Sequence, residues 1–91
     1  MIALETRPTR ADGILAQRNS DSLILLNPEN GQYFTLDEVG ARVWELCDGS
    51  HAVAEVVSAL YAEYDAPLKS IQTDVLELLG ELAGEQLVAT V

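Results

Sequence analysis

Apolar residues in the first third of the chain form short runs separated by turn signals, whereas those in the remainder recur at helical spacing. The short runs are Gly13–Arg18, Ser22–Asn27 and Gln32–Leu36, of which the last is rich in aromatic and β-branched residues. Residues 19–21 and 28–31 separate them, and Asn30-Gly31 tolerates the positive φ that a tight hairpin requires. These segments predict a small antiparallel meander of three strands.

The middle run, Ser22–Asn27, is apolar on both faces. This pattern is typical of a central strand that is covered on each side. Residues Met1–Ala11 have no clear period, and we expect them to form a loose arm or an early edge strand.

The first predicted helix follows Asp37, which can cap it, while Glu38 adds negative charge near its positive end. Asp48-Gly49-Ser50 ends this helix. Its predicted apolar face consists of Val39, Val43, Leu46 and Cys47, with Trp44 beside it as a core residue.

Two further helices are predicted on either side of a break at residues 65–67, where Pro67 fits the first turn of the third helix. The apolar stripe of the third helix is wider than a lone surface helix requires. This helix ends near Gly84, after which Leu87 and Val88 are expected to pack back onto the core. The two apolar stripes are Val53, Val56, Val57, Leu60 and Tyr64, and then Leu68, Ile71, Val75, Leu78, Leu79 and Leu82.

The order of elements predicts an α+β fold, winged-helix-like, in which an N-terminal three-stranded antiparallel sheet precedes three α-helices. The 91 residues suit a single domain over residues 1–91, and the 48% of hydrophobic residues suffices for a core. No apolar run reaches the roughly 20 residues of a membrane helix, and the N-terminus does not resemble a signal peptide. A cytoplasmic location is therefore expected, in agreement with a single cysteine, Cys47, predicted to be a buried thiol.

The net charge of −10 argues against nucleic-acid and membrane partners, because both present negative charge. In particular, Lys69 is the only basic residue of the third helix, which would be the recognition helix of a DNA-binding winged helix. An acidic surface favours a basic partner or peptide. An acidic winged-helix module for protein–protein contacts in regulation is the alternative function that fits this composition.

Catalytic chemistry has little support in the sequence. His51 is the only histidine, and no metal ligand or triad partner stands at a recognisable spacing from it. Asp21-Ser22-Leu23 has the letters of a phosphopantetheine attachment site, but Ser22 begins a predicted strand rather than a helix. We therefore expect no enzyme activity, no cofactor and no metal.

Several segments together resemble the PqqD family. They are the run from Leu26 to Gly40 (LNPENGQYFTLDEVG), Val43-Trp44-Glu45-Leu46, Asp48-Gly49, and Asp74-Val75 with Leu82 and Leu87-Val88 behind them. The resemblance covers about residues 6 to 89 and lies in this ordered series rather than in any single chemical motif. Where many members have a capping Thr, this chain has Ala52, so Ser50 or Asp48 is expected to cap the second helix instead.

The resemblance implies a domain that recognises the leader segment of a ribosomally synthesised precursor peptide and delivers it to a modifying enzyme. A radical SAM protein and a lasso-peptide leader protease are both such enzymes, so the pathway is open between PQQ and lasso-peptide biosynthesis. In the family the leader adds a strand beside the third strand and lies in a groove against the third helix. The domain itself performs no chemistry.

An unpaired third strand gives this mechanism a physical basis, because its free N–H and C=O groups can pair with an incoming strand. They could equally pair with a copy of the chain, which would make a homodimer. Strand alternation directs one of two adjacent aromatic residues to the core, without indicating which, and Asp74 is either a contact for a basic leader residue or a solvated acid. The predicted peptide-binding residues are Gln32, Tyr33, Phe34, Thr35, Leu68, Ile71, Gln72, Asp74, Val75 and Leu79.

Overall fold

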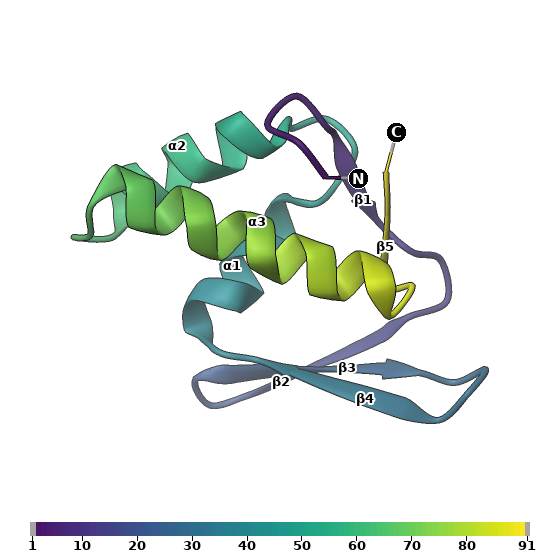
Figure 1. The fold of residues 1–91 in the computed structure, drawn as a ribbon. Coiled ribbons are helices and arrows are strands. Elements are labelled where there is room, and N and C mark those ends of the chain that lie inside the picture. The colour runs from purple at the N-terminus through teal and green to yellow at the C-terminus, as the bar shows by residue number, and fades with distance from the viewer. Residues whose placement is uncertain (1, 91) are drawn as a thin grey trace.

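A computed structural model describes residues 2–90 of the chain, with a layer of helices lying over a small sheet (Figure 1). None of the helices in this range is long and apolar enough to cross a membrane. The elements in chain order are β1 (Pro8–Arg10), β2 (Leu15–Asn19), β3 (Ser22–Asn27), β4 (Gln32–Leu36), α1 (Glu38–Leu46), α2 (Val53–Glu63), α3 (Leu68–Gly84) and β5 (Val88–Thr90).

The predicted meander is confirmed, because β2, β3 and β4 form an antiparallel sheet with β3 in the centre. The turn chemistry fixes the β3–β4 register. Asn27 accepts from the backbone N–H of Gly31 at 2.8 Å, and Gly31 has the positive φ, 71°, that the Asn-Gly pair predicts. Leu25 therefore lies opposite Phe34, and Leu26 lies opposite Tyr33.

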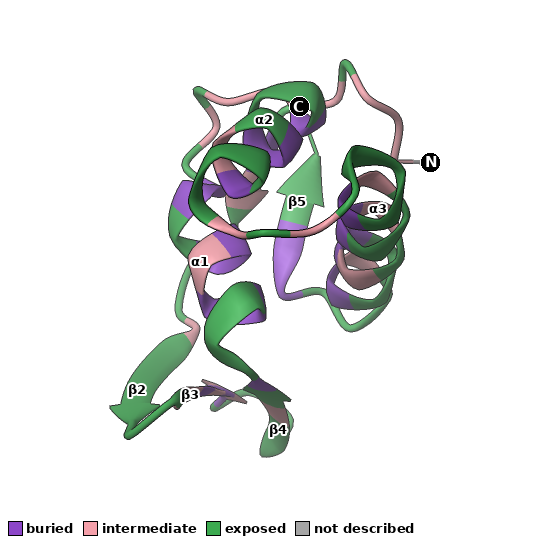
Figure 2. Ribbon diagram, turned by 90° about the vertical axis from the view of Figure 1, so that its left-hand side faces the viewer, coloured by how far each residue is buried: buried purple, intermediate pink, exposed green. Residues whose placement is uncertain are grey.

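The prediction that β3 is covered on both faces is wrong. Its side chains alternate between buried and half-buried, with Leu23 and Leu25 beneath the helices and Ile24 and Leu26 on the other face. No element of residues 2–90 lies beneath that second face, and β2 extends away from the helices as a fully exposed strand (Figure 2). The second apolar face of β3 is thus left uncovered by the described residues of the chain.

The N-terminal segment contains a strand, one of the two predicted alternatives, rather than a loose arm. Its strand β1 pairs antiparallel with β5, so the two ends of the chain form a second, two-stranded sheet. Leu87 and Val88 are buried there, as the sequence predicted. The carbonyls of Leu4 and Thr6 accept from the first backbone N–H groups of α2, each at 2.9 Å. The N-terminal segment thereby accepts hydrogen bonds from helix N–H groups that a capping side chain would otherwise bind.

Helix capping follows the sequence at α1 and departs from it at α2. Asp37 Oδ1 accepts from the Gly40 N–H at 2.7 Å, as predicted. The expected capping of α2 by Ser50 or Asp48 does not occur, because Asp48 accepts from Ser50 within the preceding turn. Instead, Glu55 reaches back and accepts from the backbone N–H of Ala52 at 2.7 Å.

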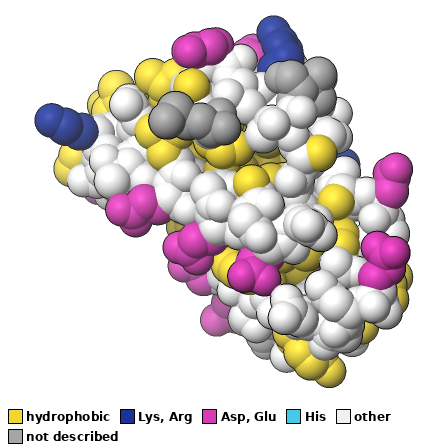
Figure 3. Space-filling view, turned by 45° about the vertical axis from the view of Figure 1, so that its right-hand side comes forward, with side chains coloured by type: hydrophobic (Ala, Val, Ile, Leu, Met, Phe, Trp, Pro, Cys, Tyr) yellow, Lys and Arg dark blue, Asp and Glu magenta, His cyan; other side chains and the backbone are white. Residues whose placement is uncertain are grey.

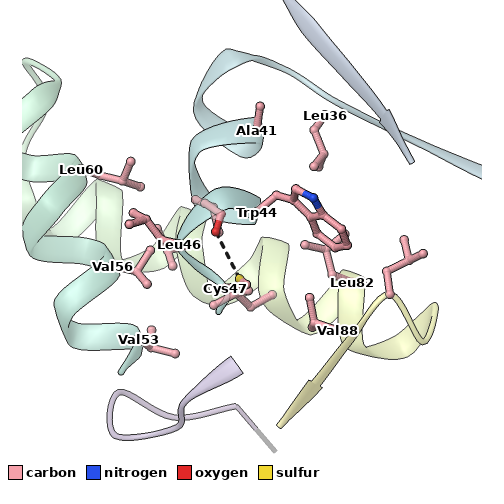
Figure 4. Packing of buried hydrophobic residues seen from close by; sticks show 14 of the residues in the cluster. Leu36, Ala41, Trp44, Leu46, Cys47, Val53, Val56, Leu60, Leu82 and Val88 are labelled. Carbon is pink, nitrogen blue, oxygen red and sulfur yellow. Dashed lines mark hydrogen bonds between the residues drawn. The ribbon is translucent and has the colours of Figure 1, made fainter. Parts of the chain in front are cut away.

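One core joins the helices to the sheet and to β5 (Figure 4). Trp44 and Cys47 are both buried in it, as predicted, and the Cys47 thiol donates to the Val43 carbonyl at 3.2 Å. Val39 was predicted to share this face of α1 but is 40% exposed. That exposure places Val39 beside the surface cleft that follows.

Candidate functional site: a cleft between β4 and α3

A cleft of about 750 Å³ opens between the edge of the sheet and the helices. Figure 3 shows hydrophobic side chains at the surface between the upper, helical part and the lower part of the molecule, with acidic side chains close by. The residues that line the cleft are Ser22, Phe34, Thr35, Leu36, Asp37, Val39, Gly40, Val43, Leu60, Tyr64, Ala66, Ile71, Asp74, Val75, Leu78 and Glu81.

Strand alternation and helical spacing build the apolar floor. Phe34 and Leu36 are two residues apart on β4 and therefore share the face that looks toward the helices. Ile71, Val75 and Leu78 recur on one side of α3 and form the opposite wall. Phe34 and Leu78 are half-buried, so apolar surface remains open to an incoming side chain.

The edge of β4 that borders the cleft has no strand beside it within residues 2–90, since β4 pairs only with β3. In an antiparallel sheet, alternate residues of such an edge strand direct their N–H and C=O groups outward. An extended peptide can therefore pair with β4 and direct its alternate side chains into the cleft. The edge of β2 is also unpaired, but all five of its residues are exposed and no comparable apolar wall faces it.

The charged groups at the cleft are acidic. Asp74 and Glu81 lie one above the other on α3, and both are exposed. Tyr64, which lines the cleft near α1, has its pKa raised by partial burial and by the nearby carboxylates Glu38 and Glu63. It therefore stays a neutral phenol at physiological pH. The cleft offers an apolar floor with an anionic border, which suits a peptide with apolar anchors and a basic residue.

The structure brings half of the predicted peptide-binding residues to the cleft lining, namely Phe34, Thr35, Ile71, Asp74 and Val75. Strand alternation directs the side chain of Thr35 to the same face as Tyr33, so it does not share the face of Phe34. The others lie elsewhere. Tyr33 is 74% exposed on the opposite face of the sheet, and Leu79 has no exposed surface because it belongs to the core. Gln32 lies at the hairpin end of β4, whereas Leu68 and Gln72 lie on α3, all outside the cleft lining.

Sequence reasoning missed the contribution of α1 and the far end of α3. Val39, Gly40 and Val43 reach the cleft because α1 follows β4 after a single residue and so begins at the end of the cleft strand. Leu78 and Glu81 stand four and seven residues after Asp74, so helical periodicity from that residue could have identified both.

A cluster of Asp48, Ser50 and His51 contains the residue types of a catalytic triad but not its geometry. The Ser50 hydroxyl donates to Asp48 Oδ1 at 2.7 Å, and His51 Nδ1 lies 2.9 Å from the same oxygen. These hydrogen bonds, the Ser50 contacts first, hold the pKa of Asp48 well below its usual range. Ser50 Oγ also lies 3.4 Å from His51 Nδ1, but this nitrogen already contacts the acid, so the hydroxyl and the ring both bind Asp48 and the cluster closes a turn. In residues 2–90, no group of three or more His, Cys, Asp or Glu side chains could hold a metal ion.

Comparison with known families gives a match over the elements that form the cleft. A family model described as coenzyme PQQ synthesis protein D (PqqD) matches residues 22–88, from the start of β3 to the first residue of β5. A PqqA binding protein of Xanthomonas oryzae pv. oryzae (strain KACC10331 / KXO85) is 33% identical over 89 residues, which are 96% of this chain and 95% of that protein. A PqqA binding protein of Bradyrhizobium diazoefficiens (strain JCM 10833 / BCRC 13528 / IAM 13628 / NBRC 14792 / USDA 110) is 38% identical over 60 residues, 66% of this chain and 56% of that one.

Two solved structures share the fold. The structure of TbiB1 in complex with the TbiA(beta) leader peptide has a TM-score of 0.78 and 31% identity, covering 88% of this chain and 93% of TbiB1. Lasso peptide synthetase B1 complexed with the leader peptide has a TM-score of 0.80, covering 91% of this chain and 98% of that one. The latter is 19% identical, so its likeness concerns the fold alone.

Proposed function

The chain belongs to the PqqD family, and on that premise we propose that it binds the leader segment of a ribosomally synthesised precursor peptide in the β4–α3 cleft. The observation that carries this proposal is the coincidence of an unpaired strand edge with an apolar cleft along the same strand. TbiB1, 31% identical to this chain, has been solved with a leader peptide, and relatives of similar identity bear the name PqqA binding protein.

Strand addition divides affinity and specificity between two parts of the site. Backbone pairing with β4 holds any extended segment, because N–H and C=O groups do not read sequence. The side chains that enter the cleft meet Phe34 and Leu36 on one side and Ile71, Val75 and Leu78 on the other. We infer that this leader carries apolar residues at alternate positions along the paired segment.

The energetics of such a complex are reasonable. Each buried apolar anchor contributes about 1.5–3 kcal/mol, and ordering a flexible leader opposes binding by several kcal/mol, roughly 2–5. A micromolar complex requires about 8 kcal/mol net. Three anchors at the upper end of this range, together with the backbone hydrogen bonds of a short strand, approach this amount.

The anionic border of the cleft adds a charge preference. Asp74 and Glu81 are exposed, on the side of α3 that borders the cleft. A leader with a Lys or Arg near its anchors would form charge-assisted hydrogen bonds with them. The net charge of −10 would also accelerate the encounter with a basic leader.

The domain acts by delivery rather than by catalysis in this proposal. It presents the leader in the cytoplasm to a modifying enzyme, either a leader protease of lasso-peptide type or a radical SAM protein. In the absence of a leader, a second copy of the chain could pair along β4, and the leader would compete with that homodimer for the same edge.

Binding of labelled leader peptides tests the proposal directly. Fluorescence anisotropy would measure the affinity for three labelled peptides, namely PqqA, the TbiA(beta) leader and the leader of any precursor found encoded beside this chain's gene. Scrambled versions of the same composition control for charge alone. We expect micromolar or tighter binding to at least one native leader, with at least tenfold weaker binding of its scrambled form. Failure of all three leaders to bind would contradict the proposed function.

A further inference from the structure

The outer face of the β2–β3–β4 sheet, which looks away from the helices, carries an apolar patch. In the register of the sheet, Leu15, Leu26 and Tyr33 lie side by side in one row across the three strands, and Ile24 lies in the next row. Side chains in such rows are in contact distance of each other. The outer patch, as defined by these four residues, is therefore contiguous rather than a set of scattered apolar residues.

The patch is open to solvent within the described chain. Tyr33 is 74% exposed and Leu15 is 57% exposed, while Ile24 and Leu26 between them are half-buried. Figure 3 shows hydrophobic side chains reaching the surface at the lower end of the molecule, where Figure 1 places the sheet. A contiguous exposed apolar patch of this kind marks an interaction surface. An interaction surface here also accounts for the apolar pattern of β3, which predicts that both faces of the strand are buried.

Charge distinguishes the candidate occupants of the patch. The outward positions of the three strands carry no charged residue, although the chain as a whole has a net charge of −10. Asp21 and Glu29 stand in the turns at the two ends of this face, and both are exposed. Two copies packed face to face would bring acidic turns together, in addition to the repulsion between their net charges. A different protein with an apolar surface bordered by basic residues fits the patch better.

The position of the outer patch indicates which partner protein would dock on it. Strand β4 contributes Phe34 to the cleft and Tyr33 to the outer patch, so the two surfaces are opposite sides of one strand. A leader paired with β4 would extend the sheet by one strand and add its own outward side chains to the outer face. A protein docked on that face would therefore contact the domain and the leader at once.

We propose that the outer patch is the docking surface for the enzyme that processes the bound leader, an enzyme whose own contact surface is apolar with a basic border. This inference rests on the proposed function, because the leader completes the surface. It requires that the bound leader strengthens enzyme docking, since the surface on offer is larger when the added strand is in place.

A double variant, Leu15→Ser with Tyr33→Ser, removes the two exposed side chains of the patch and leaves its half-buried members in place. Tyr61→Ser is the matched control, because Tyr61 is 53% exposed on α2, in the helical layer. Biolayer interferometry would measure binding of any leader protease or radical SAM protein found encoded beside this chain's gene, with and without the leader that binds this chain. Anisotropy would measure the affinity of each variant for the leader. Circular dichroism would check that each variant is folded, and light scattering would give its molecular mass in solution.

We expect the double variant to lose at least tenfold in enzyme affinity while leader affinity stays within threefold, and the Tyr61→Ser control to stay within twofold for both. We also expect the leader to raise the affinity of the wild-type chain for the enzyme. Equal enzyme binding by the double variant and the wild type, or no enzyme binding by the wild type, would overturn the docking assignment and leave leader binding intact. A wild-type dimer that the double variant abolishes would assign the patch to a second copy instead. If the wild-type chain did not bind any leader, that result would instead count against the proposed function.

Discussion

Tyr33 and Phe34 are neighbours on β4, yet they serve opposite faces of the sheet. Phe34 lines the cleft beside α3, whereas Tyr33 is 74% exposed on the face that the helices do not cover. The sequence indicated that one of the two aromatics faces inward without indicating which one. Their separation allows one strand to hold a peptide on one side and to present a second surface on the other.

Replacement of Phe34 by Ala should weaken leader binding by about tenfold or more, because the leader loses an apolar partner worth about 1.5–3 kcal/mol. Tyr33→Ala is the control, since it changes an aromatic residue on the same strand but on the opposite face. We expect its leader affinity to stay within threefold of the wild type. Anisotropy with a labelled leader measures both variants, and equal losses in the two would contradict the assignment of Phe34 to the cleft.

The acidic border of the cleft should matter for a basic leader. Asp74→Asn and Glu81→Gln each remove one carboxylate from the cleft, and we expect each to weaken binding by about twofold to fivefold, which corresponds to an exposed charge pair of about 0.4–1 kcal/mol. Glu77→Gln is the matched control, because Glu77 is exposed on α3 but does not line the cleft. The differences between variants should shrink as salt is added. Equal effects of all three changes would indicate general attraction by net charge.

Removal of the α1 cap should destabilise the fold. Asp37 Oδ1 accepts from the Gly40 N–H at 2.7 Å, and loss of such a cap costs about 1 kcal/mol, within a range of about 0.5–2. We therefore expect Asp37→Ala to lower the free energy of unfolding in urea by that amount. Asp37→Asn retains an acceptor oxygen and should restore most of it. If Asn proved as damaging as Ala, the hydrogen bond would not be the cause.

The buried thiol should be protected from thiol reagents. Burial raises the pKa of Cys47 to about 11 from an ordinary value of 9.0, so the native chain holds little thiolate at neutral pH. We expect labelling by a disulfide reagent to be slow in the native state and rapid in concentrated urea. Because the unfolded thiol ionises first, this residue should lower stability as pH rises from about 9 to about 11. Rapid native labelling near pH 7 would show that the side chain is accessible.

Much of the fold was predictable because its signals are local. The bounds of β3 and β4 agree with the sequence prediction, since the Asn30-Gly31 turn fixes their register. The pairing of β1 with β5 was not predictable, because three-residue strands from opposite ends of the chain carry no periodicity. Similarly, the arm that satisfies the start of α2 does so with backbone carbonyls, which no side-chain pattern reveals.

The candidate site was predictable only in part, for a related reason. Helical spacing identified Ile71 and Val75, but it also selected Leu79, whose side chain lies in the core, whereas Asp74 was named from the family resemblance. A wide apolar stripe indicates how much apolar surface must be buried, but it does not indicate which of its residues the core of the chain buries and which remain free to bind a peptide. The same limit explains β3, whose second apolar face the sequence assigned to the interior and the structure leaves open.

Amide hydrogen exchange of the chain with and without a leader peptide tests the central claim, which is strand addition at β4. We expect the leader to slow exchange at alternate amides within Gln32–Leu36, where outward N–H groups acquire partners, and to leave Leu15–Asn19 unchanged. Protection confined to the β2 edge, or tight binding with unaltered exchange in β4, would contradict the account.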